Sequence, residues 1–334
     1  TIVVMNINFS MWGKALRIIP RVSKKEWDEL DPIAKWLIAS RSAVFLMTAF
    51  SVFVGALLAV DRADFAWLPF VLCLVGLVLA HATNNLFNDY TDSVRGVDAD
   101  NYFRTIYGPQ ALENGLWTKK TMLMVIGATG AIALACGIAL LSITGSVLLW
   151  PLFAGVFFVL FYTWPLKLIG MGEPSVILVW GPLMVGGTYA AITGDWSWEV
   201  AAIGAVYALG PTTVLFGKHT DKLTEDKKKS IHTLPVILGE RNARYSVIAM
   251  LIAQPIIVTA MVIDGMLSWP MLLVLLGIPS IFSTCAVFLK PRPTTKPKDY
   301  PAEGWPTYLA GYAFKCNRIT GSLFVLGLII SLFV

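Results

Sequence analysis

Nine apolar stretches, each long enough to cross a bilayer, dominate this sequence of 334 residues. About 20 apolar residues in a helix span the roughly 30 Å of hydrocarbon, and only helices or closed barrels satisfy their backbone groups there. The composition agrees, since 56% of the residues are hydrophobic and 14% are charged. The sequence therefore predicts an all-α integral membrane protein, a bundle of nine transmembrane helices at residues 42–60, 65–87, 121–142, 145–161, 174–193, 200–217, 245–263, 267–288 and 319–334.

The basic residues indicate the orientation of this bundle. Cytoplasmic connections of membrane proteins are enriched in Lys and Arg, and of the 26 such residues only Arg62 falls on the side opposite to the N-terminus. We expect a multi-pass protein of the cell (inner) membrane, with its N-terminus cytoplasmic and its C-terminus outside. The net charge of +5 then reflects topology and attraction of lipid heads or a phosphorylated substrate, and no nucleic acid is expected as a partner.

Composition divides the chain into an N-terminal segment and a helical domain, and it marks one long connection within that domain. Residues 1–41 mix apolar and basic side chains, which predicts an amphipathic segment at the cytoplasmic interface. Residues 42–334 would form the nine-helix domain. Within it, residues 289–318 are rich in Pro and Lys, which indicates an extended, solvated linker.

A first polar cluster follows the second apolar stretch. If the helix continues, Asn85, Asp89 and Asp92 lie on one face at i, i+4 and i+7, with Asn88 beside them. Mg²⁺ commonly binds one or two carboxylates together with substrate phosphates, so this spacing suits a Mg²⁺–diphosphate clamp. The alternative is that these residues only solvate a helix end, but such a dense polar group is costly at the end of an apolar helix.

A second polar cluster follows the sixth apolar stretch. Asp221 and Glu225 form an i, i+4 pair on a helix, and Asp226 follows directly. These acids could hold a second metal ion, with Lys218 and Lys222 contacting the phosphates. The alternative is a solvated loop of alternating charge, and the equivalent position of the two clusters in two related halves favours a shared site.

Further candidates lie between the two clusters. Lys167 could meet the diphosphate from a third side, and Tyr162 could present its ring to a carbocation. A snorkelling lysine and an interfacial tyrosine explain the same pair without function. Arg104, Tyr107 and Gln110 follow the first acids and are candidates for holding phosphate.

These motifs resemble those of the UbiA-type membrane prenyltransferase superfamily, over most of the chain. Members are similar in having nine transmembrane helices and an Asn-Asp-x-x-Asp-x-x-x-Asp-like motif after the second. Asn88, Asp89 and Asp92 match this motif directly. Gly96 stands where many members have the last aspartate, and Asp98 supplies it two residues later. This variant looks most like the branch that prenylates 1,4-dihydroxy-2-naphthoate for menaquinone.

The rest of the resemblance is less uniform. The Tyr-Thr-x-x-Pro run at Tyr162 and the Thr-Leu-Pro-Val-Ile-Leu-Gly run from Thr233 also look like that branch. The second family motif is Asp-x-x-x-Asp, and here Asp221 is followed four residues later by Glu225. The asparagine usual four residues before the first acid is Gly217.

The resemblance implies a Mg²⁺-dependent enzyme that transfers an isoprenyl group from a prenyl diphosphate to an aromatic acceptor within the bilayer. Its central cavity would open to the cytoplasmic side. Catalysis would involve Asp89, Asp92, Lys167 and Tyr162, and the metal ligands would be Asn88, Asp89, Asp92, Asp98, Asp221, Glu225 and Asp226.

Three other interpretations fit parts of the sequence. A cyclase of the same family would fold the allylic cation back onto its own double bonds. A secondary transporter would place its acids near the midplane, whereas these gather at one edge. In a structural or pigment-binding subunit, the clusters would have no chemical role, and removal of Mg²⁺ would change nothing.

Overall fold

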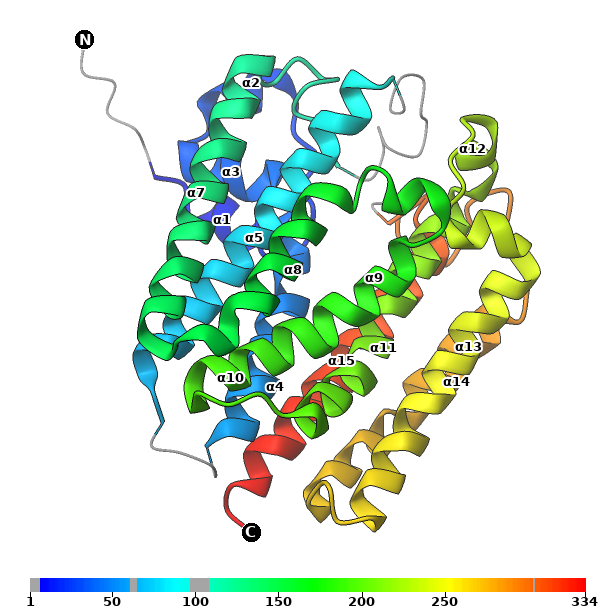
Figure 1. Ribbon diagram of the computed structural model, residues 1–334. Coiled ribbons are helices and arrows are strands. Elements are labelled where there is room, and N and C mark those ends of the chain that lie inside the picture. The colour runs from blue at the N-terminus through cyan, green and yellow to red at the C-terminus, as the bar shows by residue number, and fades with distance from the viewer. Residues whose placement is uncertain (1–6, 61–64, 97–107, 303) are drawn as a thin grey trace.

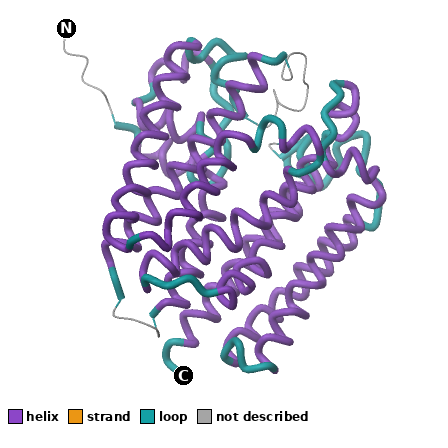
Figure 2. The backbone as a smooth tube through the Cα atoms, viewed as in Figure 1, coloured by secondary structure: helices purple, strands orange, loops and turns teal. Residues whose placement is uncertain are grey.

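The computed structural model describes residues 7–60, 65–96, 108–302 and 304–334, and these residues are mostly helical (Figure 2). No strand occurs among them. A helix satisfies its backbone donors and acceptors within one segment, which is what a hydrocarbon environment requires. The prediction of an all-α integral membrane protein is confirmed.

Eight helical segments in the described residues are long and apolar enough to cross a membrane (Figure 1). Several are continuous across a change of helix type. The segments are η1 with α4 (Ser42–Val44 and Phe45–Ala59), α5 (Trp67–Val94), α7 (Lys119–Thr144), α9 with η4 and α10 (Gly172–Leu178, Val179–Gly186 and Gly187–Thr193), α11 (Trp198–Asp221), α13 (Leu234–Ile263), η5 with α14 (Trp269–Gly277 and Ile278–Phe288), and α15 (Tyr308–Ser331).

A ninth apolar helix is shorter. It consists of η2 (Ser146–Leu148) and α8 (Leu149–Phe161). At 1.5 Å per residue a helix of this length covers about 24 Å, less than the roughly 30 Å of a bilayer core. Each predicted apolar stretch therefore overlaps a helix, but the count of nine crossings is not confirmed.

One buried apolar cluster joins α4, η4, α10, α11, α13, η5 and α15. Val185, Tyr207, Met271 and Phe324 are almost fully buried in it. The Tyr207 hydroxyl donates to the Met47 carbonyl at 3.1 Å, which satisfies a polar group inside an apolar core. Figure 1 shows α11 and α15 side by side, with α13 and α14 forming a pair at one side.

A proline inside α11 is compensated by a neighbouring helix. Pro211 has no N–H, so the Tyr207 carbonyl loses its helical partner. Gln254 of α13 fills the gap, because its Nε2 donates to the carbonyls of Tyr207 at 3.2 Å and Val206 at 3.1 Å. The break in the hydrogen-bond ladder thus fixes α13 against α11.

The N-terminal segment packs on the ends of α5 and α7. It forms α1 (Phe9–Ala15), α2 (Lys24–Glu29) and α3 (Pro32–Ala39), and its buried side chains share an apolar cluster with Leu86 and Met122. Trp27 is 1% exposed and meets Trp117 edge-on at 5.5 Å between ring centroids. The separation of this segment from the bundle at residue 41 remains a prediction.

One carboxylate ties the N-terminal helices together. Asp31 caps α3 by accepting from the Ala34 amide at 2.9 Å, and it also accepts from the Asn8 amide and the Trp12 indole. Burial opposes ionisation of Asp31, but these hydrogen bonds outweigh it, so the pKa of the carboxyl lies below its usual value.

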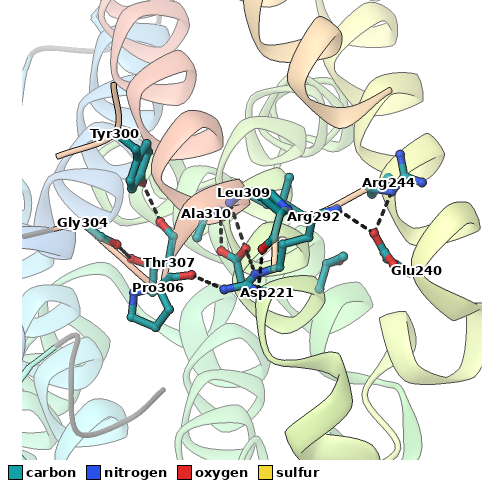
Figure 3. Close-up of polar contacts among 12 residues, drawn as sticks. Asp221, Glu240, Arg244, Arg292, Tyr300, Gly304, Pro306, Thr307, Leu309 and Ala310 are labelled. Atoms are coloured by element: carbon teal, nitrogen blue, oxygen red, sulfur yellow. Dashed lines mark hydrogen bonds and ion pairs between the residues drawn. The ribbon is translucent and has the colours of Figure 1, made fainter. Parts of the chain in front are cut away.

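The linker prediction for residues 289–318 was wrong. Residues 308–318 are the first turns of α15, and the preceding loop is tied down by Arg292 and Tyr300. Tyr300 donates to the Thr307 carbonyl at 2.7 Å, and Arg292 donates to the Pro306 carbonyl at 2.9 Å (Figure 3). The sequence analysis began the last helix at residue 319, after Lys315 and Arg318, because charges are atypical of a membrane-spanning stretch.

Replacement of Asp31 by Ala should loosen the N-terminal segment. Loss of an N-cap alone costs about 1 kcal/mol, so Asp31→Ala should speed tryptic cleavage between α1 and α2 in detergent. Because the folded pKa of Asp31 is lowered, its stabilisation is complete above the usual aspartate pKa and disappears as the pH falls through the folded value.

Asp28→Ala is the matched control for that experiment. The Asp28 carboxylate pairs with Lys24 on an exposed surface of the same segment, and such pairs contribute about 0–1 kcal/mol. Equal cleavage rates in the two variants would contradict the role given to Asp31.

Candidate active site

A cavity of about 910 Å³ lies between α5, α7, α8, α9 with η4, and α11. Most of its lining is apolar, with contributions from Leu72, Leu134, Phe158, Leu183 and Met184. The charged lining residues come from the ends of α5 and α11, the turn after α8 and the N-terminal segment. The predicted central cavity is therefore present, with an apolar body and a charged mouth.

The polar face of α5 forms one side of the mouth. The helix continues through Val94, as predicted, and Asn84, Asn85, Asn88 and Asp92 line the cavity. Asn88 donates through Nδ2 to the Thr163 hydroxyl at 3.0 Å. Asn84 donates to a backbone carbonyl of α8, and Asn85 donates to the Ser40 carbonyl directly after α3. These bonds use the amide nitrogens and leave the carbonyl oxygens as the groups suited to a cation.

The two aspartates of α5 are each held by a basic residue. The Lys167 ammonium donates to both Asp92 oxygens, at 2.8 and 3.0 Å, and both side chains are largely buried. Asp89 pairs with Arg41 at 3.1 Å. Removal of one partner from such a buried pair is strongly destabilising, so the pairs fix the mouth. Asp92, Lys167 and Arg41 line the cavity, whereas Asp89 does not.

Arg41 is a site residue that sequence reasoning missed. Its backbone has φ 59° and ψ 50°, a left-handed conformation that is unfavourable for a residue with a side chain. The turn aims its guanidinium at Asp89 and at the Asn85 carbonyl, to which it donates at 3.0 Å. Such strain persists where the surroundings hold it and is frequent at functional sites. The sequence carries no turn signal at this position.

The end of α11 forms the opposite side of the mouth. Lys218, His219 and Lys222 line the cavity. His219 is 2% exposed, and its Nδ1 lies 2.6 Å from Oε1 of Glu173, which is equally buried. The sequence offered no sign of this pair, because the two residues lie 46 positions apart. Lys222 pairs with Asp226 at 3.0 Å.

Asp221, the first acid of the second motif, is directed away from the cavity. Its Oδ1 accepts from the Leu309 amide at 2.9 Å and from Arg292 at 3.1 Å, and its Oδ2 accepts from the Ala310 amide at 3.0 Å (Figure 3). These amides belong to the first turn of α15, where backbone N–H groups lack helical partners. Asp221 therefore caps α15. Glu225 and Asp226 do not line the cavity either.

The remaining candidates divide into three groups. Tyr162 lines the cavity, as expected for a residue near the substrate. Gln110 is buried in the loop before α7 and is not among the lining residues. Asp98, Arg104 and Tyr107 lie outside the described residues.

No group of three or more His, Cys, Asp or Glu side chains in the described part of the chain could hold a metal ion alone. Asn88 and Asp92 nevertheless carry the oxygen donors that Mg²⁺ prefers, and they line the cavity together. Substrate phosphates would have to complete such a site. The α5 side of the mouth therefore fits a metal ion that binds with its substrate.

The sequence has known relatives. Residues 48–305 match the UbiA prenyltransferase family. The 1,4-dihydroxy-2-naphthoate octaprenyltransferase of Escherichia coli is 26% identical over 218 residues, covering 63% of this chain and 70% of that protein. The UbiA prenyltransferase domain-containing protein 1 homolog of Drosophila melanogaster is 26% identical over 197 residues, covering 58% of this chain and 53% of that protein. This chain thus spans about half the length of the Drosophila relative.

Solved structures share the fold. A UbiA homolog from Archaeoglobus fulgidus bound to GPP and Mg²⁺ matches with a TM-score of 0.60 at 15% identity, over 90% of this chain and 99% of that chain. The apo structure of a UbiA homolog from Aeropyrum pernix K1 gives 0.64 at 17% identity, over 86% and 98%. The family match covers well over half of the sequence and its fold agrees, so this chain belongs to the UbiA prenyltransferase family.

Proposed function

We propose that this protein transfers an isoprenyl group from a prenyl diphosphate to an aromatic acceptor. The observation that carries the proposal is the composition of the cavity, whose apolar body ends in a mouth lined by five basic residues and, among the described residues, one carboxylate. An apolar chain with a diphosphate head has the complementary shape and charge. The basic residues are Arg17, Arg41, Lys167, Lys218 and Lys222.

Mg²⁺ would be held on the α5 side by Asn88 and Asp92. Asp89 supports this site by holding Arg41, and Asp98 of the resembled motif remains a further candidate ligand. Bound Mg²⁺ would neutralise charge on the departing diphosphate. The relative from Archaeoglobus fulgidus, whose structure contains GPP and Mg²⁺, supports both the donor class and the metal.

The chemistry begins when the C1–O bond of the allylic diphosphate breaks and its electron pair leaves with the diphosphate. Lys167 and Lys218 donate hydrogen bonds to that charge as it develops. An aromatic carbon of the acceptor then forms the new bond to C1 and loses its proton. We assign His219, held by Glu173, as the base that receives this proton. The Tyr162 ring lines the same cavity and can face the cation.

Two relatives support the choice of acceptor. The relative from Escherichia coli is named for 1,4-dihydroxy-2-naphthoate, and a relative from Synechocystis is named a 2-carboxy-1,4-naphthoquinone phytyltransferase. A naphthoate-type ring is therefore the acceptor to test first. Quinone-type lipid biosynthesis would be its context.

The charged mouth would face the cytoplasm of a cell whose inner membrane holds the bundle. In Figure 1 the charged ends of α5 and α11 lie at the same end of the bundle as α2 and α12, and the C-terminus lies at the other. This separation agrees with the distribution of Lys and Arg in the sequence.

The alternatives give different products. A cyclase would consume the prenyl diphosphate and release a cyclic hydrocarbon without an acceptor. A transporter would bind its ligand without breaking a covalent bond. Incubation with GPP and Mg²⁺, with and without 1,4-dihydroxy-2-naphthoate, followed by mass analysis of the products, distinguishes all three.

Asp92→Asn should lower turnover at least a hundredfold, because it removes the carboxylate that faces the cavity while keeping its shape. Chelation of Mg²⁺ should abolish turnover of the unaltered protein. Asp195→Asn, at an exposed acid that does not line the cavity, is the control and should leave the rate unchanged. Full activity of Asp92→Asn in folded protein would refute the proposed site.

Gly155→Leu should shorten the isoprenyl chain that the protein accepts. Gly155 lines the cavity, and a Cβ placed there meets no atom within 4 Å, so the new side chain would enter open space. We expect the rate with long prenyl diphosphates to fall more than the rate with DMAPP. Phe153→Leu, at an exposed position on the same helix, should leave this preference unchanged.

A further inference from the structure

The segment that carries the second acidic motif turns a basic face to the cavity. Lys218 and Lys222 lie at i and i+4 and both line it, whereas Asp221, Glu225 and Asp226 do not. The reason is local. Asp221 ends α11, Lys222 has φ −112° and ψ 20°, and α12 (Leu223–Lys228) starts in a new direction. Because of this change of direction, the acids of the segment do not reach the cavity lining.

The acids of this side are also engaged in structural contacts. Both oxygens of Asp221 accept hydrogen bonds from α15, and Arg292 adds another. Asp226 is 1% exposed and pairs through Oδ1 with Lys222. Its Oδ2 has no hydrogen-bond partner among the described residues. Neither of these aspartates lines the cavity, and neither does Glu225. Among the described residues, this side therefore presents no carboxylate at the cavity to share a hard divalent cation with a substrate phosphate.

Lys222 has what a substitute for a metal ion requires. Its side chain is 11% exposed, lines the cavity and is held in place by a buried carboxylate. A lysine ammonium is a compact positive charge with three N–H donors. It can therefore neutralise a phosphate oxygen and donate to it, as Lys167 does from the other side of the mouth.

We propose that Lys222, held by Asp226, takes the place of a second divalent cation at the diphosphate, with Lys218 beside it. The inference rests on the proposed prenyl diphosphate function and deepens it. The chain would then bind its diphosphate with a single metal ion, on the α5 side. Part of its affinity for the diphosphate would be independent of metal, because protein cations supply it.

Calorimetric titration of the detergent-purified chain with inorganic pyrophosphate in EDTA tests the metal-independent part. We expect measurable binding, weakened at least tenfold by Lys222→Met. Lys227→Met removes the same charge from an exposed position on α12 and should change the affinity less than twofold.

Because Lys222→Met leaves Asp226 buried without its partner, the double variant Lys222→Met/Asp226→Asn repeats the test if the single variant does not fold. Unchanged binding in the folded variant would overturn the proposal.

Counting metal ions gives an independent readout. Electron paramagnetic resonance with Mn²⁺ and geranyl S-thiolodiphosphate should find one ion per chain. Lys222→Asp places two acids at i and i+4 with Asp226 and should raise the count to two. Two ions in the unaltered protein, together with normal prenyl transfer, would contradict only this inference. Absence of pyrophosphate binding and of prenyl transfer would instead reject the proposed function.

Discussion

Charges that line a cavity inside a membrane protein need partners, and these partners determine how the mouth is built. Three basic residues of the mouth are each held by a carboxylate: Arg41 by Asp89, Lys167 by Asp92, and Lys222 by Asp226. A buried charge without its partner is strongly destabilising, whereas a matched pair is tolerated. The first two pairs join parts of the chain that are far apart, so they hold α5, the turn after α8 and the N-terminal segment together before any ligand arrives.

This arrangement has a chemical advantage. Electrostatic stabilisation is most effective when the donors are already in place and need not reorganise as charge develops. The left-handed turn at Arg41 and the hydrogen bonds that tether the α5 asparagines restrict these groups in the same way. A flexible loop could supply the same charges, but it would lose conformational entropy each time it bound a diphosphate.

The sequence alone predicted the features of the site that depend on the geometry of a single helix. The continuation of α5 through Val94 and the position of Asn85 and Asp92 at the cavity follow from helical spacing. Asp89, predicted on the same face, instead pairs with Arg41 and does not line the cavity. The direction of Asp221 did not follow, because it depends on a break at Lys222 and on a contact with α15, far along the chain. Arg41 and the Glu173–His219 pair were missed for the same reason, since tertiary packing brings Arg41 to the cavity and Glu173 to His219.

The N-terminal segment contributes Arg17, Ile18 and Ile19 to the lining of the cavity, yet it precedes residues 48–305, which match the family. The entrance is thus built partly from residues that lie outside the match to the family. Helices that cross a bilayer are constrained by its thickness, whereas a segment packed on their ends is free of that limit. A change in this segment can therefore reshape the entrance without changing the helices that cross the bilayer.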